Sequence, residues 1–394
     1  MGSRPRLRAL LRDALHDALH DALHDALHDA LDCAFRDARR AAVGVAACTA
    51  ALVACDGASP PATARTGGPS ASDPSPVTAR TRMDAYEWLA SNSAPAGYPM
   101  EIVGGDFAYA GGSRYIPKAK LHAGWGKEVS LHVVGDGPVP LPDRVDVVFF
   151  SHLEDRFYRG RFALPRDSIA RLFREGFARD VPGGGRGTYN SLVAGVAPGG
   201  AVAVWVSGSD RQVEVFFGQA EPADIDFHQA FDAPATADRR QFVADEVADA
   251  AESDPMVRTA SAAPVPVGRW AAYRTRYPWQ PTFAGLGQPS GGAALSFLNG
   301  ERDRLALPLD AAEARLPRPV PQFFAFRDPG ARRAYHVTFD AEEAAAAFAR
   351  VGAGGRAVEL AFTGASDGVG VAVRASGQEV PLRKARVEQF VVDR

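Results

Sequence analysis

The sequence predicts an α+β protein, predominantly of antiparallel β-strands, in which two tandem, duplicated domains each hold a sheet and one packed helix. Three observations favour this fold class. The chain has 39 glycines and 29 prolines among 394 residues, which favours many turns and short strands. Two distant segments alternate apolar and polar residues in a similar pattern. In each half of the chain, a helical pattern follows a pair of predicted strands.

The composition limits the classes of function. Hydrophobic residues make up 46% of the chain and charged residues 23%, as in folded globular proteins. A net charge of −3 gives no basic excess for binding a phosphate backbone, so we expect no nucleic-acid partner. The chain contains no G-x-S-x-G, H-E-x-x-H or P-loop motif. We therefore assign no catalytic residue and expect no metal and no cofactor.

Residues 1–54 are predicted to be a leader. They contain the low-complexity repeat "DALHDALHDALHDALHDAL", whose leucines recur every four residues and therefore drift around a helix instead of forming one seam. Four histidines have an i, i+4 spacing that could hold a metal, namely His16, His20, His24 and His28. Every residue type in the unit repeats equally, so expansion of a short codon unit, or a start site assigned too far upstream, is the favoured explanation.

The leader ends in the pattern of a bacterial export signal. Three arginines precede an uncharged apolar run at residues 41–54. As a helix this run would cover roughly 21 Å, short of the ~30 Å hydrocarbon core of a bilayer. The order Leu52-Val53-Ala54-Cys55 resembles the lipobox of bacterial lipoproteins. The alternatives are an ordinary cleaved signal and a buried apolar helix.

The lipobox resemblance implies a membrane anchor at Cys55. The cysteine would carry a diacylglyceryl thioether and, after cleavage, an acylated amino terminus, with palmitate as one such acyl group. Two or more acyl chains make a stable anchor. We therefore expect a lipid-anchored protein of the bacterial cell envelope that faces the periplasm, on either the inner or the outer membrane.

A tether and a folded body follow the cysteine. Residues 55–83 are rich in Pro, Ser, Thr and Gly and hold hardly any large apolar side chain, so we expect a disordered tether. Order should begin near Tyr86 and Trp88. All three cysteines lie within the first 55 residues, so the body has no disulfide and no cysteine metal site.

The body compares well with itself. "AVAVWVSGSDRQVEVFF" at 201–217 aligns without a gap on "AVELAFTGASDGVGVAV" at 357–373, and both read as hairpins with one buried face. "VVFFSHLEDRFYRGRF" at 147–162 similarly parallels "PQFFAFRDPGARRAYHVTF" at 321–339, and a helical stretch follows each. Between helix and final hairpin, residues 176–200 are expected to form a long loop, a common location of function.

The self-comparison predicts the domain boundaries. The duplicated domains are expected at residues 84–230 and 265–394, joined by a connecting helix and linker at 231–264. The helix should stop at Asp254-Pro255. The alternative is two unrelated β-rich regions, which would alternate in the same way because all half-buried strands do.

Several motifs of the first domain resemble a known family. These are "YEWLASNSAPAGYP", the Gly124-Trp125-Gly126 triplet, "FYRGRFALPRDSIARLFREGF", and the turn "APGG" before a tryptophan-bearing strand. Residues 86–227 thereby resemble a family of bacterial lipoproteins catalogued as domain of unknown function 2931. The family has no assigned catalytic residue to carry over. The resemblance implies an envelope lipoprotein and adds one alternative, a periplasmic immunity protein that neutralises a secreted toxin.

Two sets of side chains are candidates for a site. Four aromatics fall in Gly-rich turns and are candidates for binding a peptide, glycan or protein partner, namely Tyr109, Tyr115, Trp125 and Tyr189. Alternatively, they pack as lids of the core. His152, Glu154 and Asp155 cluster in sequence and would serve a hydrolase. The favoured hypothesis is a non-enzymatic, membrane-anchored binding or interaction module.

Overall fold

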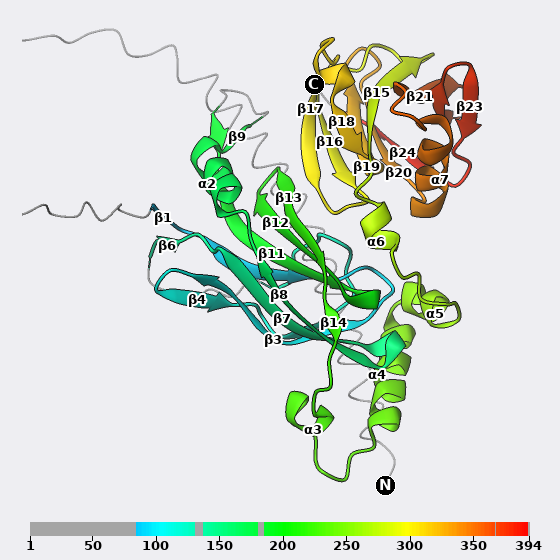
Figure 1. Cartoon of the computed structure of the whole chain (residues 1–394). Coiled ribbons are helices and arrows are strands. Elements are labelled where there is room, and N and C mark those ends of the chain that lie inside the picture. Colours follow the sequence, from blue (N-terminus) through cyan, green and yellow to red (C-terminus); the bar gives the residue numbers. More distant parts are fainter. Residues whose placement is uncertain (1–83, 131–136, 180–184, 367, 393–394) are drawn as a thin grey trace, which may run out of the picture. The chain divides into compact units, whose positions relative to one another are not determined.

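The computed structural model describes residues 84–130, 137–179, 185–366 and 368–392 (Figure 1). The predictions for the leader, for Cys55 and for the whole tether lie outside these residues. The described residues belong to one compact unit. Its fold is a strand-rich α+β fold in which most strand pairs are antiparallel, which confirms the predicted class of a predominantly antiparallel α+β protein.

The first half of this unit spans residues 85–222 and contains one long helix, α2 (Arg166–Glu175), with two short turns, η2 (His152–Glu154) and η3 (Pro198–Gly200). Its strands are β1 (Ala85–Tyr86), β2 (Leu89–Ser93), β3 (Met100–Tyr109), β4 (Gly112–Tyr115), β5 (Ala119–Leu121), β6 (Val139–Pro140), β7 (Arg144–Ser151), β8 (Arg156–Ala163), β9 (Phe177–Ala178), β10 (Arg186–Gly187), β11 (Tyr189–Ala197), β12 (Ala201–Gly208), β13 (Gln212–Gln219) and β14 (Glu221–Pro222).

The second half spans residues 276–391 and contains the helix α7 (Ala341–Val351) and the turn η4 (Glu313–Arg315). Its strands are β15 (Arg276–Ala284), β16 (Gly291–Phe297), β17 (Arg302–Leu307), β18 (Pro317–Pro319), β19 (Pro321–Asp328), β20 (Arg333–Thr338), β21 (Val358–Ala365), β22 (Gly368–Ala375), β23 (Gln378–Pro381) and β24 (Arg386–Val391).

The halves are joined by α3 (Phe227–Ala230), α4 (Arg239–Ser253), α5 (Pro255–Ser261) and α6 (Arg269–Ala272). α4 ends directly before Asp254-Pro255, where the sequence predicts a stop. α3 and α4 bring Phe227 and Val243 against Phe150 and Phe157 of the β7–β8 pair, and this contact buries the apolar residues of the connecting segment. No helix among the described residues is long and apolar enough to cross a bilayer.

Each half contains two larger sheets around one core, and the first half adds the two-stranded sheets β1-β6 and β9-β10, so the prediction of a single sheet per domain is wrong. In the first half the strand orders are β14-β8-β7-β3-β4 and β2-β11-β12-β13. Both sheets contribute to one apolar cluster, which includes Trp88, Phe149 and Val204. Alternation reveals that each strand has one buried face, but it does not reveal which strands share a sheet.

The strands of the second half follow the same order and pair in the same way. β15 runs parallel to β21 as β2 runs parallel to β11, and each parallel pair continues through two antiparallel neighbours. The other strands form β24-β20-β19-β16-β17, which follows the connectivity of β14-β8-β7-β3-β4. The long helix α2 follows β8 and precedes β11, the strand that completes the parallel pair of the first half. In the second half α7 likewise follows β20 and precedes β21, so the two helices occupy the same place in the chain order.

Individual contacts recur at corresponding positions. Trp88 Nε1 donates to the carbonyl of Pro140 at 3.3 Å, and Trp279 Nε1 donates to that of Pro319 at 2.9 Å. Two residues before each tryptophan, a tyrosine packs on a phenylalanine of the long helix. A stacked Phe–Tyr pair also joins the central strands in both halves, at 5.4 Å in Phe149–Tyr158 and 4.9 Å in Phe326–Tyr335.

The strand pairing corrects two expectations. The alignment of 201–217 on 357–373 is displaced by one strand, because β21 pairs with β15 as β11, not β12, pairs with β2. Residues 176–200 are not one long loop, because they contain β9, β10 and the almost fully buried strand β11. β11 was missed because its small residues, among them Ser191 and Gly195, weaken the apolar pattern.

A single bridge between Gln212 of β13 and Arg302 of β17 joins sheets of the two halves. It produces one sheet with the order β2-β11-β12-β13-β17-β16-β19-β20-β24. The contacts around this bridge are called the seam below. They involve Trp125, Gly126, Trp205, Ser207, Gln212 and Glu214 of the first half, Arg274 and Arg276, and residues 299–302 of the second half.

Candidate functional site

The four aromatic residues that the sequence singled out do not form one surface. Tyr109 and Tyr115 lie on the β3–β4 hairpin, where Tyr115 is 41% exposed. Tyr189 is 3% exposed and packs against Phe177 in the first core, as in the alternative that these aromatics are lids of the core. Trp125 lies at the seam.

The indole of Trp125 packs between two other tryptophans. Its ring centroid lies 4.9 Å from that of Trp205 and 6.3 Å from that of Trp270. Its Nε1 is buried and has no hydrogen-bond partner among the described residues. Trp125 therefore belongs to an internal contact between the first half and the connecting helix α6.

The three hydrolase candidates engage separate structural partners. His152 is buried, and its Nε2 lies 3.1 Å from Oε2 of Glu101. Its Nδ1 is buried without a partner, and its ring contacts Phe150 and Phe231. The contact between His152 and Glu101 links the end of β7 to β3.

Glu154 and Asp155 each stabilise a neighbouring segment. Both carboxylate oxygens of Glu154 accept the N–H of Gly199, at 3.1 and 2.9 Å, and one also accepts the hydroxyl of Tyr158 at 3.0 Å. Burial and this hydrogen bond raise the pKa of Tyr158 to about 12. Asp155 pairs with Arg239 of α4 at 2.7 Å. His152 and Asp155 line one pocket beside α4, but Glu154 does not line it and each of the three side chains is engaged by a different partner, so the three candidates do not converge on one reacting atom.

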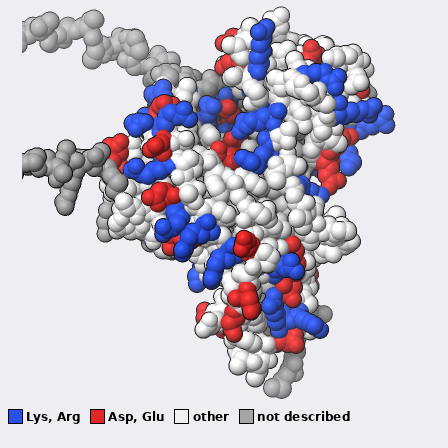
Figure 2. Space-filling model, viewed as in Figure 1, with Lys and Arg blue, Asp and Glu red and all other residues white. Residues whose placement is uncertain are grey.

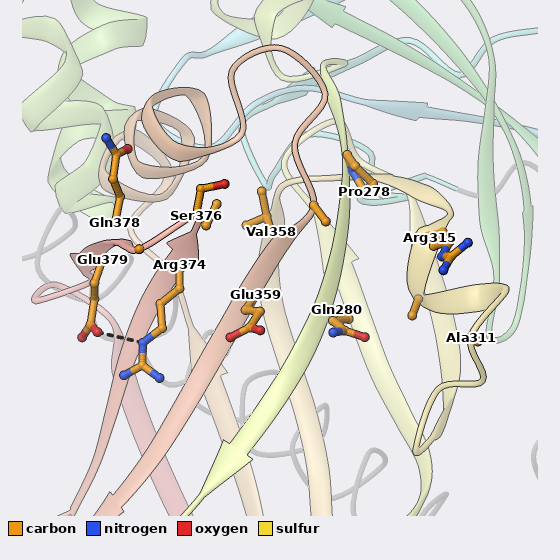
Figure 3. Close-up of a pocket in the computed structure, with 14 residues that line it drawn as sticks. Pro278, Gln280, Ala311, Arg315, Val358, Glu359, Arg374, Ser376, Gln378 and Glu379 are labelled. Carbon is orange, nitrogen blue, oxygen red and sulfur yellow. Dashed lines mark hydrogen bonds and ion pairs between the residues drawn. The ribbon is translucent and has the colours of Figure 1, made fainter.

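A groove of about 600 Å³ lies on the second half, over the outer face of the sheet β15-β21-β22-β23 and beside η4. Figure 3 shows Glu379, Arg374, Glu359 and Gln280 in a row across neighbouring strands, with Arg315 entering from a separate segment. The register explains the row, because Gln280 faces Glu359, Glu359 faces Arg374, and Arg374 faces Glu379. Cross-strand neighbours of this kind lie within contact distance on one face of a sheet.

Gln280, Glu359, Arg374 and Glu379 are called the charged row below, and several of their polar groups are free to bind a ligand. Arg374 Nε donates to Glu379 at 2.8 Å, which leaves the Nη groups of the guanidinium available. Within the described residues, the side chains of Gln280, Glu359 and Arg315 make no hydrogen bond or ion pair. The groove can thus accept and donate charge-assisted hydrogen bonds, as needed to bind a polypeptide or another polar ligand with both signs of charge.

The residues at the equivalent positions of the first half already bind other parts of the chain. Ser191 faces Ser207, and Ser207 faces Gln212, at the positions that Glu359, Arg374 and Glu379 hold in the second half. The amide of Gln212 donates to the carbonyls of Gly126 at 2.7 Å and Gly300 at 2.6 Å. Gln212 is almost fully buried.

Further side chains of this face also hold polypeptide. Trp205 Nε1 donates to the carbonyl of Asn299 at 3.1 Å, and Ser207 accepts a hydrogen bond from Arg302 at 2.9 Å. The first half therefore uses this sheet face to bind the turn that contains Asn299 and Gly300.

The seam also contains buried charge. Glu214 of β13 pairs with Arg274 at 2.5 Å, and Glu301 pairs with Arg276 at 2.6 Å while accepting the N–H of Glu214 at 3.1 Å. Burial raises the pKa of Glu214, and the nearby Arg274 partly opposes that rise. Burial likewise raises the pKa of Asp303, which pairs with Arg211.

Figure 2 shows basic and acidic side chains interspersed on the face displayed. Among the described residues, no group of three or more His, Cys, Asp or Glu is arranged to hold a metal ion.

Sequence reasoning missed the charged row. The signal was a polar residue on the outward phase of each strand, at Glu359 in β21 and Arg374 in β22. That signal could not identify a site, because most outward positions of half-buried strands are polar. Only the pairing of four strands brings the charges together.

Comparison with known protein families gives one result. Residues 73–261 match the model of a family described as "Protein of unknown function (DUF2931)". The match covers the first half and the connecting helices α3, α4 and α5, and it ends at Ser261, the last residue of α5, so α6 and the second half lie outside it. Comparisons with curated proteins and with solved structures find no match. Residues 73–261 thus match the model of the same family, the domain of unknown function 2931, that the sequence motifs resemble.

Proposed function

We propose that this protein is a non-enzymatic binding module of the bacterial cell envelope, anchored through a lipidated Cys55, and that it binds a polypeptide partner in the groove of its second half. One observation supports this function above all others. A sheet face that the first half uses to hold a polypeptide turn is open in the second half and carries the charged row.

The proposal includes a duplication of the domain. Matching strand order, matching parallel pairs and the paired contacts of Trp88 and Trp279 support a common origin of the two halves. After duplication, the face in the first half became the seam. The same face in the second half kept a free surface and exchanged serines for Glu359 and Arg374.

Photo-crosslinking tests the groove. A photoreactive amino acid replaces Gln378, an exposed residue that lines the groove, in the full-length protein inside the producing cell. A matched variant carries it at the exposed Glu252 of α4, outside the groove. We expect a light-dependent adduct of discrete mass from position 378 only. Equal adduct patterns from both positions, or no adduct from either, would contradict groove binding.

A separate measurement tests the anchor. Cys55→Ala should move the protein from the membrane fraction to the soluble periplasmic fraction, because the acyl chains supply the membrane affinity. Mass spectrometry of the wild-type protein should find acyl chains on the peptide that begins at Cys55. Membrane association that survives Cys55→Ala, with no lipid mass on the wild type, would refute lipidation and leave the groove proposal untouched.

A further inference from the structure

We infer that the DUF2931 domain carries a second binding site, a socket for a polypeptide segment with one tryptophan and, four residues later, one arginine. In this chain residues 269–276 occupy the socket. The inference concerns another surface than the groove and does not depend on it.

The socket is an aromatic cage. Trp270 of α6 is 2% exposed, and its ring meets Tyr98 edge-on at 5.5 Å and Trp125 at 6.3 Å. Ala197 and Ala201 form the floor of the contact. A buried tryptophan surrounded by aromatic rings is the usual anchor of a protein–protein interface.

The two motifs most specific to the family resemblance line this cage. Trp125 comes from the Gly124-Trp125-Gly126 triplet, and Ala197 begins the turn that continues to Gly200. The small residues of the turn permit close packing of the segment that leads into α6, since a Cβ on Gly199 would lie 2.7 Å from Cγ1 of Val267. The motifs are therefore explained by a docking surface.

A buried carboxylate adds a recognition site for a cation. The side chain of Glu214 is 6% exposed, one oxygen binds Arg274, and the other is buried without a partner among the described residues. The Arg274 guanidinium lies 4.8 Å from the ring centre of Phe217. An unpaired carboxylate in this position would be costly to bury, so the site requires a cation from its occupant.

The occupant lies outside the family domain. The family match ends at Ser261, whereas Trp270 and Arg274 follow it. All cage residues and Glu214 lie within 73–261, so the socket is a property of the domain and the segment 269–276 is its resident occupant. Tethering gives this segment a high effective concentration, and it excludes free partners from the socket.

Emptying the socket tests the inference. The full-length variant Trp270→Ala/Arg274→Ala lacks both anchors, and the probe is a fluorescein-labelled peptide with the sequence of residues 266–276, "PVGRWAAYRTR". We expect the double variant to bind the peptide at least tenfold more tightly than the wild type does, as measured by fluorescence anisotropy. The peptide should also raise the melting temperature of the double variant and leave that of the wild type unchanged.

Two controls separate recognition from general stickiness. A peptide with alanine in place of the tryptophan and of the arginine at position 274 should lose at least tenfold in affinity, and Glu214→Gln in the double variant should weaken binding of the unmodified peptide. Trp270→Leu/Arg274→Ala replaces the double variant if that protein lacks cooperative unfolding. The inference would be overturned if the peptide did not bind a cooperatively folded variant, or if its affinity were unchanged by the two peptide substitutions.

Discussion

At the residue scale, the seam depends on small side chains as much as on large ones. Gly126 and Gly300 bring two backbones into contact, and both have positive φ angles, +78° and +85°. Gln212 then reaches both carbonyls with one amide. A glycine-rich turn is often flexible, but here the glycines permit close contact between the two halves.

Gly126→Ala should therefore destabilise the protein beyond the ordinary cost of a left-handed alanine. Gly111→Ala is the matched control, because Gly111 also has a positive φ, +95°, but open space around it. We expect urea unfolding to show an additional loss of about 1–3 kcal/mol for Gly126→Ala, the usual cost of overpacking. Equal losses in the two variants would show that the backbone contact does not constrain the seam.

At the element scale, the sequence predicted many strands and the helices α2 and α7, but it did not predict which strands pair with one another. α7 follows its predicted pattern, with Phe348 and Val351 buried on one face. The hairpin alignment failed because any two half-buried hairpins alternate alike, whereas the parallel pairs β2–β11 and β15–β21 involve strands far apart in sequence. The tyrosine–x–tryptophan pattern at Tyr86 and Tyr277 was the better signal of the repeat, but it is too short to be noticed without the structure.

The two halves should respond alike to one substitution. Trp88→Phe and Trp279→Phe each remove the indole N–H that holds a proline carbonyl and leave a smaller ring in a full core. We expect each to lower the free energy of unfolding by about 1–3 kcal/mol, the combined cost of a lost hydrogen bond and a small cavity. A large loss in one variant beside no loss in the other would argue against equivalent roles.

At the scale of the whole molecule, one sheet face has two uses. In the first half, side chains on it bind the turn around Gly300 and bury Glu214 beside Arg274. In the second half, it presents Glu359 and Arg374 to the groove. The sequence could suggest a binding module because it carries no motif for catalysis or a metal, but the groove could not be predicted, because its residues come from separate strands and from η4.

The most direct test of groove binding is the photo-crosslinked adduct at position 378 in charge variants of the full-length protein. Glu359→Ala/Arg374→Ala removes the free carboxylate and the guanidinium of the charged row, whereas Arg161→Ala removes one exposed charge of the first half and serves as control. The account predicts that the adduct falls at least tenfold in the first variant and persists in the control. An adduct that is unchanged by Glu359→Ala/Arg374→Ala would contradict the assignment of this groove as the binding site.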